Sequence, residues 1–316
     1  MMRSVITLCF CVVLSGCSSL FSAKIPDWWT HTPVDSEQWM YGVGEGANAD
    51  IAQQQALTYI AGKLKTRVSS QLSVKTTETN TYYAQYAERN IRSSIQNTDL
   101  SHFQIQERVV DSSAHITRVL IRLDRQALAQ AWRNQYQELS QKVTQARQRE
   151  AAQSLFAWWM NARATLPVAQ QADVLALQLG ALLNRKSTSN LWTDLQQLIR
   201  QTPIQVGVDG DNSAISQQVT DLLNQQELRV VRCSSCDLKL SYHTKVDYQK
   251  IFDQQVATLE FYGELKDAHG LVSQQHWIVQ GSSITNTSFA YKAASAKAAE
   301  YIQKHGLWKS FGLDQD

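Results

Sequence analysis

The sequence has little of what catalytic and nucleic-acid-binding sites are usually built from. Seven histidines are scattered singly along 316 residues, with no H-E-x-x-H spacing, and no serine stands in a G-x-S-x-G elbow. A large excess of one sign of charge is also missing, because the formal net charge is +2 and acidic and basic residues are interspersed. We therefore expect no catalytic residues, no metal, no cofactor and no nucleic-acid partner, and hence a protein that is not an enzyme.

The chain begins with a short apolar leader. Arg3 supplies a positive charge, an apolar run follows from Val5 to Leu14, and Leu14-Ser15-Gly16-Cys17 closes the segment. The run is too short to span a bilayer and indicates a secretory signal. The Leu-Ser-Gly-Cys tetrad resembles the lipobox of bacterial lipoproteins, which implies cleavage before Cys17 and attachment of acyl chains such as palmitate there. The alternative is an ordinary secretory signal in which Cys17 is an incidental residue.

The residues after Cys17 bear on the location of the anchor. Ser18 and Ser19 stand where lipoproteins retained in the inner membrane usually carry Asp, which by resemblance implies the outer membrane, with the body on the periplasmic side. No apolar run after the leader approaches the length of a membrane span, so Cys17 is the one anchor that we expect.

The body of the chain has enough apolar residues to fold. Hydrophobic residues make up 43% of the sequence and charged residues 18%. Their periodicity predicts an α+β fold with two mixed α/β domains joined by a helical middle segment. The expected parts are a signal peptide at 1–16, a lipidated tether at 17–36, a mixed domain at 37–124, a helical segment at 125–202 and a second mixed domain at 203–316.

The first mixed domain opens with a glycine-rich strand, Trp39 to Gly46, which precedes a helix predicted for Ala49 to Val68. Such glycines can bind phosphate, but their spacing fits no phosphate motif and Glu45 would repel an anion. We expect instead that they let the helix pack close to the sheet. The other predicted elements are a strand at Val68–Thr77, a polar helix or excursion at Thr81–Asn97, and a hairpin of Phe103–Val110 and His115–Leu123.

Three stretches of this domain carry a family resemblance. They are Pro26-Asp27-Trp28-Trp29, Tyr41-Gly42-Val43-Gly44-Glu45-Gly46, and an alanine-rich helix that ends in Leu64-Lys65-Thr66-Arg67-Val68-Ser69-Ser70. Together they resemble the twenty-kilodalton Lpp-type outer-membrane lipoprotein family, here called the Lpp-twenty family, over roughly Ile25 to Leu123. The resemblance implies a bacterial envelope lipoprotein, and some members of the family serve the flagellum.

Two groups of aromatic residues are candidates for partner binding. They are the tryptophans Trp28 and Trp29 and the tyrosines Tyr82, Tyr83 and Tyr86. The alternative for the tryptophans is docking on the first domain, because large aromatic side chains are more often buried. The alternative for the tyrosines is that they cover one edge of the sheet.

The middle segment is the most helix-like part of the sequence. One long helix is predicted for Arg125 to Leu166, stopped by Pro167, followed by helices at Val168–Leu183 and Leu191–Ile199. Short connections favour a small bundle. Self-association through the long helix is the alternative that the pattern leaves open.

The second mixed domain is predicted to have the order β-α-β-β-β-β-α, ending in a helix at Ala290–His305 that Gly306 caps. Cys233 and Cys236 fall between two of its strands, where no helix begins, so we expect a disulfide rather than a redox-active thiol. A zinc site would need further ligands, of which only His243 is near in the sequence.

These features predict a non-enzymatic outer-membrane lipoprotein that binds an envelope or flagellar protein in the periplasm. A second hypothesis is a regulator of an envelope enzyme such as a peptidoglycan synthase, although the long proline-rich linker that would favour it is missing. A third is a periplasmic thiol oxidoreductase that uses Cys233 and Cys236.

Overall fold

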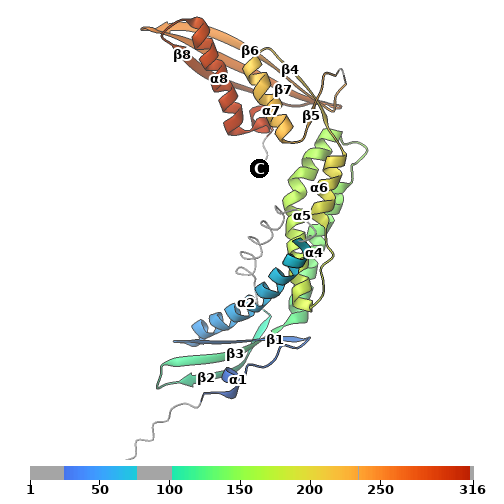
Figure 1. The fold of residues 1–316 in the computed structure, drawn as a ribbon, viewed down its shortest axis with the longest axis vertical. Helices are drawn as coiled ribbons and strands as arrows, with labels where there is room; N and C mark the ends of the chain where they lie inside the picture. The colour runs from blue at the N-terminus through green and yellow to red at the C-terminus, as the bar shows by residue number, and fades with distance from the viewer. Residues whose placement is uncertain (1–24, 77–101, 234, 314–316) are drawn as a thin grey trace, which may run out of the picture. The chain divides into compact units, whose positions relative to one another are not determined.

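The computed structural model describes residues 25–76, 102–233 and 235–313, and the fold is α+β, as predicted. The predicted signal peptide lies outside these residues. The chain divides into two compact units, of which unit 1 comprises Met1–Tyr136 and Val174–Thr188 and unit 2 comprises Gln137–Asp173 and Ser189–Asp316. Helices α4 (Arg125–Arg147) and α5 (Leu155–Leu183) each contribute residues to both units (Figure 1).

Unit 1 is built on a three-stranded antiparallel sheet with the order β1-β3-β2. Helix α2 packs on β1 and β3, and the short helix α1 lies near β3. The predicted hairpin is confirmed, because β2 and β3 pair around a turn that follows Asp111. The bounds are α1 Asp27–Thr30, β1 Trp39–Gly46, α2 Ala49–Thr76, β2 Phe103–Asp111 and β3 Ile116–Asp124.

The glycines of β1 bring α2 against the sheet, as predicted. A Cβ atom on Gly42 would lie 2.5 Å from the carbonyl oxygen of Ala56, and one on Gly44 would lie 2.1 Å from that of Ala52. No side chain fits into such a gap, so the backbone of α2 lies directly on the backbone of β1. Asn48 caps this helix, since its side chain accepts a hydrogen bond of 2.9 Å from the backbone N–H of Ile51.

The strand predicted at Val68–Thr77 is wrong, because α2 continues through these residues to Thr76. The alternation of Val68 and Ser70 indicated a strand, but Val68 also extends a stripe of buried residues spaced four apart. That spacing keeps the stripe on one helical face against the sheet, and packing therefore decides the structure. The stripe consists of Ala52, Ala56, Ile60, Leu64 and Val68.

A buried arginine links the two segments of unit 1. Arg125 is 2% exposed, and its Nε donates a hydrogen bond of 2.8 Å to the carbonyl oxygen of Leu182 near the end of α5. Its Nη1 and Nη2 donate to the carbonyl oxygens of Ser36 and Leu182. Burial lowers the pKa of Arg125, while the charge of Asp35 opposes that shift. The side chain thus satisfies the carbonyl oxygen of Leu182, which would otherwise be buried without a partner.

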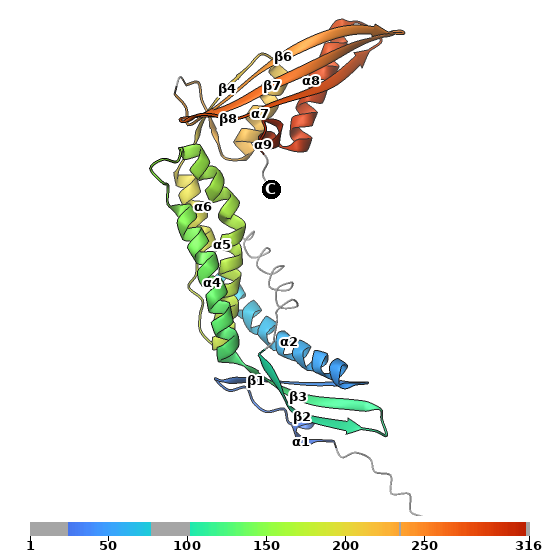
Figure 2. The same ribbon diagram turned by 180° about the vertical axis from the view of Figure 1, so that it is seen from behind.

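The single helix predicted for Arg125–Leu166 is wrong. The chain leaves the helical conformation after Arg147 and a new helix begins at Leu155. Ser154 starts it, since its Oγ accepts a hydrogen bond of 3.1 Å from the backbone N–H of Ala157. The third predicted helix is confirmed as α6 (Leu191–Gln201). The parts of α4 and α5 that belong to unit 2 run beside it (Figure 1 and Figure 2).

Pro167 does not end a helix, contrary to the prediction, but lies inside α5. The missing N–H costs about 3 kcal/mol, and the apolar residues buried on both sides of Pro167 offset that cost. Among the described residues, one helix, α5, is long and apolar enough to cross a membrane. The expectation that no apolar run after the leader has that length is therefore wrong. Buried residues make up 61% of its most apolar window, so packing within the protein accounts for this hydropathy.

The C-terminal part of unit 2 is a five-stranded mixed sheet with the order β5-β4-β6-β7-β8. The predicted order of elements is confirmed, and Gly306 caps α8 with a positive φ of 86°. Helices α7 and α8 cover one face of the sheet (Figure 2). Alternate residues in the first part of β6 and in the middle of β7 are buried, namely Leu238, Leu240, Tyr242, Ala257, Leu259, Phe261 and Leu265. The bounds are β4 Gln205–Gly210, α7 Ser213–Gln225, β5 Arg229–Val230, β6 Leu238–Ile251, β7 Gln254–Asp267, β8 Gly270–Ser283, α8 Thr287–His305 and α9 Leu307–Ser310.

Candidate functional site

The residues predicted from the sequence lie in different places. Trp28 in α1 is buried, with its ring edge-on to that of Trp29 at 6.2 Å between centroids. Its indole packs inside unit 1, as the docking alternative expects, and is not accessible to a partner. Trp29 is half-buried, and the guanidinium of Arg118 lies 5.5 Å from its ring centroid. Cys17 and the tyrosines Tyr82, Tyr83 and Tyr86 lie outside the described residues.

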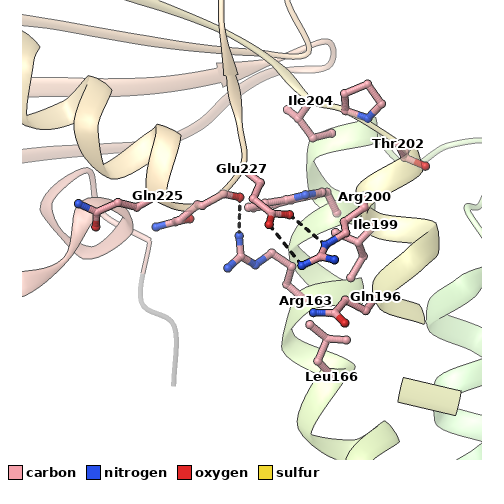
Figure 3. A pocket seen from close by; sticks show the side chains of 12 residues that line it. Arg163, Leu166, Gln196, Ile199, Arg200, Thr202, Ile204, Gln225 and Glu227 are labelled. Atoms are coloured by element: carbon pink, nitrogen blue, oxygen red, sulfur yellow. Dashed lines mark hydrogen bonds and ion pairs between the residues drawn. The ribbon is translucent and has the colours of Figure 1, made fainter. Parts of the chain in front are cut away.

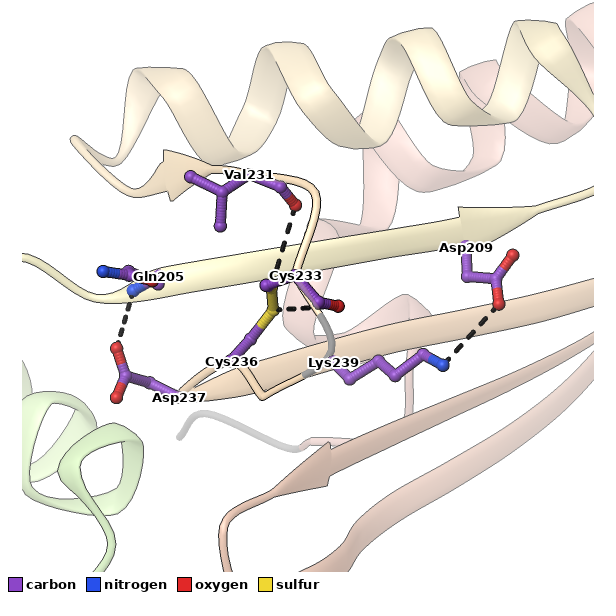
Figure 4. The surroundings of a disulfide bond; sticks show 7 residues. All are labelled: Gln205, Asp209, Val231, Cys233, Cys236, Asp237 and Lys239. Atoms are coloured by element: carbon purple, nitrogen blue, oxygen red, sulfur yellow. Dashed lines mark hydrogen bonds and ion pairs between the residues drawn. A yellow bond between two sulfur atoms is a disulfide. The ribbon is translucent and has the colours of Figure 1, made fainter.

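Cys233 and Cys236 form a disulfide between β5 and β6, with their Cα atoms 5.8 Å apart (Figure 4). The bridge lies against β4 at Gly207, where an added Cβ atom would stand 2.9 Å from the Sγ of Cys236. Asp237 fixes the same loop, since its carboxylate accepts a hydrogen bond of 2.8 Å from the backbone N–H of Gln205. The element that follows Cys236 is a strand, so these sulfurs lack the helix N-terminus that activates redox-active cysteines.

The face of the C-terminal sheet opposite α7 and α8 carries a row of stacked rings. His243, Tyr262 and His276 are cross-strand neighbours on β6, β7 and β8. Their ring centroids are 4.8 Å and 4.4 Å apart and the rings are nearly parallel. The hydroxyl of Tyr262 donates to the carboxylate of Glu260, which lowers the pKa of Glu260 and raises that of Tyr262.

A shallow hollow of about 360 Å³ adjoins this row. Its rim combines acidic and hydroxyl groups from the end of β4 and from β6 and β7. The described residues contain no group of three or more His, Cys, Asp or Glu side chains that could hold a metal ion. The lining residues are Asp209, Gly210, Asp211, Ser241, Tyr242, His243, Tyr262 and Glu264.

Large apolar side chains are exposed together at the far end of the same sheet, which we call the apolar end. Phe252, in the turn between β6 and β7, is 93% exposed, and Ile284, directly after β8, is 79% exposed. The register places Phe252 and Ile284 at the same end of the sheet, because Ile251 pairs with Gln254 and Ser283 pairs with Gln255. This feature was not predicted from the sequence, although an apolar pair directly before Asp253 in a turn is unusual. The apolar end consists of Ile251, Phe252 and Ile284.

No family model and no curated protein matches the chain. Among solved structures it resembles the secreted protein HP1454 from Helicobacter pylori, with a TM-score of 0.48 and 14% identity, over 88% of this chain and 100% of that one. It also resembles a minor lipoprotein from Acinetobacter baumannii (TM-score 0.29, 11% identity, 35% and 96%) and lipoprotein GNA1162 from Neisseria meningitidis (0.22, 10%, 32% and 99%). These neighbours are secreted proteins and lipoproteins of bacteria, and their identities are too low to carry a function to this chain.

Proposed function

We propose that this chain is a lipid-anchored envelope protein that binds another protein and has no catalytic activity of its own. The observation that carries the proposal is the apolar end of the C-terminal sheet. Soluble proteins rarely expose large apolar side chains in groups unless the group contacts a partner. Phe252 and Ile284 are the most exposed members, and both stand at the ends of strands, where a partner can reach them.

The apolar end is far from the end of the sheet at which the disulfide lies. β6 begins at Leu238, directly after the disulfide loop, and ends at Ile251. A strand of that length spans about 45 Å. One end of the sheet therefore carries the disulfide between Cys233 and Cys236, and the opposite end carries the exposed apolar residues. This arrangement suits a rigid element that presents a contact surface to a partner.

The leader supports the anchored part of the proposal. Leu14-Ser15-Gly16-Cys17 matches the lipobox pattern, and Ser18 favours the outer membrane over the inner one. The Lpp-twenty resemblance supports a partner in the envelope, and among the envelope machines it favours the flagellum. We therefore propose an outer-membrane protein that faces the periplasm and contacts a flagellar or other envelope protein.

The partner contact is tested by placing a photo-crosslinking amino acid at position 252 or 284 of the full chain in its native host. We expect both positions to yield crosslinks to the same envelope protein. Position 239 serves as the control, because Lys239 is also exposed but lies at the disulfide end of β6. Equal products from all three positions, or none from 252 and 284, would contradict a specific contact at the apolar end.

The anchor is tested independently with Cys17→Ser. We expect the wild-type chain in the membrane fraction and the variant in the soluble periplasm, since the acyl chains supply the membrane affinity. The identity of the crosslinked protein then separates the remaining hypotheses. A flagellar component supports the motility role, whereas a peptidoglycan synthase supports the regulator.

A further inference from the structure

A cavity of about 250 Å³ opens within unit 2, where α5 and α6 meet the turn after α7 (Figure 3). Its walls are mixed, with Leu166 and Ile199 contributing apolar surface and Arg163 and Arg200 contributing positive charge. The turn is held in place from behind, because the indole N–H of Trp308 donates a hydrogen bond of 2.9 Å to the side chain of Gln226. This hydrogen bond holds the turn that forms one wall of the cavity.

Arg163 is the half-buried cation of this cavity. Its guanidinium lies over the ring of Trp159, 4.6 Å from the centroid, and this stacking fixes the plane of its N–H groups. One of them, on Nη1, donates a hydrogen bond of 3.1 Å to the backbone carbonyl of Gln226. The carbonyl is neutral, so the bond orients the guanidinium without neutralising its charge. Burial lowers the pKa of Arg163, while the charge of Glu227 opposes that shift.

The carboxylate of the cavity pairs with the other arginine of its lining. Glu227 forms its ion pair with Arg200, at 3.4 Å from Nε, and attracts Arg163 only at longer range. Among the described residues that line the cavity, the charged ones are thus two arginines and one glutamate. The cavity carries a net positive charge, and the guanidinium of Arg163 retains N–H groups that can receive an anion.

Glu227 has a backbone conformation that is uncommon for a residue other than glycine. Its φ is +62°, in the left-handed region, directly after the end of α7. Glycine is the usual residue at this position of a helix terminus, and other residues there cost about 1 kcal/mol of strain. The carboxylate of Glu227 pairs with Arg200 and so lowers the net positive charge of the cavity.

We propose that this cavity binds a small ligand that carries a carboxylate or phosphate group, received by Arg163 and supported by Arg200. The stacked guanidinium supplies a planar pair of donors, the arrangement that proteins use for bidentate recognition of such oxyanions. Because its walls come from the helices and from the turn that leads into the sheet, a bound anion stabilises that junction. The cavity shares no residue with the apolar end, so the anion proposal can be tested independently of the proposed partner contact.

The test is calorimetric titration of the purified full chain with sodium phosphate and, separately, sodium succinate, at constant ionic strength maintained with sodium chloride. We expect saturable binding of at least one anion with a dissociation constant of about 1 mM or below. Arg163→Gln should weaken binding about tenfold, because a charge-assisted pair is lost. Glu227→Gln should tighten binding about threefold, because it removes the competing carboxylate. Binding of only one anion assigns the ligand to that chemical class.

Arg149→Gln is the control, since it removes the same charge from an exposed position in the loop between α4 and α5. If Arg163→Gln fails to fold, Arg163→Lys retains the charge but loses the planar pair of donors, and weaker binding is again expected. A purely structural Arg163 would give the Arg163→Lys variant the anion affinity of the wild-type chain. Absence of binding in the wild-type chain, or equal affinity in the Arg163 and Arg149 variants, would overturn the proposal.

Discussion

Gly44 in β1 and Ala52 in α2 touch backbone to backbone, so that a Cβ atom on Gly44 would stand 2.1 Å from the carbonyl oxygen of Ala52. Gly44→Ala must therefore push α2 away from the sheet. We expect a loss of about 3 kcal/mol in the free energy of unfolding, at the upper end of overpacking costs. Urea denaturation followed by circular dichroism measures the change.

Gly62 provides the matched control for this substitution. It lies in α2 as well, but an added Cβ atom would meet nothing within 4 Å. Gly62→Ala should raise stability by about 1 kcal/mol, because alanine is the better helix former. Equal effects of the two substitutions would show that close approach does not govern position 44.

Arg125 leads to a second prediction. Arg125→Gln removes the donors that serve the carbonyl oxygens of Leu182 and Ser36 and leaves the carbonyl oxygen of Leu182 buried without a partner. We expect a loss of about 3 kcal/mol, because a buried carbonyl oxygen loses hydrogen bonds from a charged donor and is left unpaired. Arg108→Gln, on the exposed strand β2, should change stability by less than about 0.5 kcal/mol. Thermal unfolding of both variants measures these changes in stability. A small effect at position 125 would contradict the role of Arg125 as a buried hydrogen-bond donor.

Asp111 predicts a pH dependence. The hydroxyl of Ser113, and then the backbone N–H of Ala114, donate to its carboxylate and lower its pKa below the usual value. A lowered folded-state pKa stabilises the fold fully above the unfolded pKa of about 3.9, and this contribution is lost as the pH falls through the folded value. Asp111→Asn should therefore destabilise the protein at neutral pH, with the difference from wild type vanishing in acid. A difference that is the same at both pH values would refute the prediction.

Much of the fold follows from local patterns that the sequence displays. The glycine spacing of β1 predicted the close approach of α2, and the turn at Asp111 predicted the hairpin, because each needs only residues near in sequence. The errors arose where tertiary packing overrode a local signal. Burial on both sides carries α5 through Pro167, and contact with the sheet keeps Val68 helical.

The candidate sites were harder to predict than the fold. The disulfide could be expected from two neighbouring cysteines in an exported chain. The stack of His243, Tyr262 and His276 depends on the register of three strands, and the pair of Arg163 with Trp159 faces a turn more than 60 residues away. Such arrangements require the pairing of distant segments, which no short motif in this sequence encodes.

The disulfide and Gly207 give the last prediction, because the bridge occupies the space that a side chain at position 207 would need. An added Cβ atom would lie 2.9 Å from the Sγ of Cys236 and 3.4 Å from that of Cys233. Removing the bridge with Cys233→Ala and Cys236→Ala should cost about 2 kcal/mol, since the closed loop is short. Gly207→Ala should cost about 2 kcal/mol in the oxidised chain but clearly less in the double-alanine background, where both sulfurs are gone. Urea denaturation of the four chains measures this coupling, and strictly additive effects would show that the bridge does not pack on Gly207.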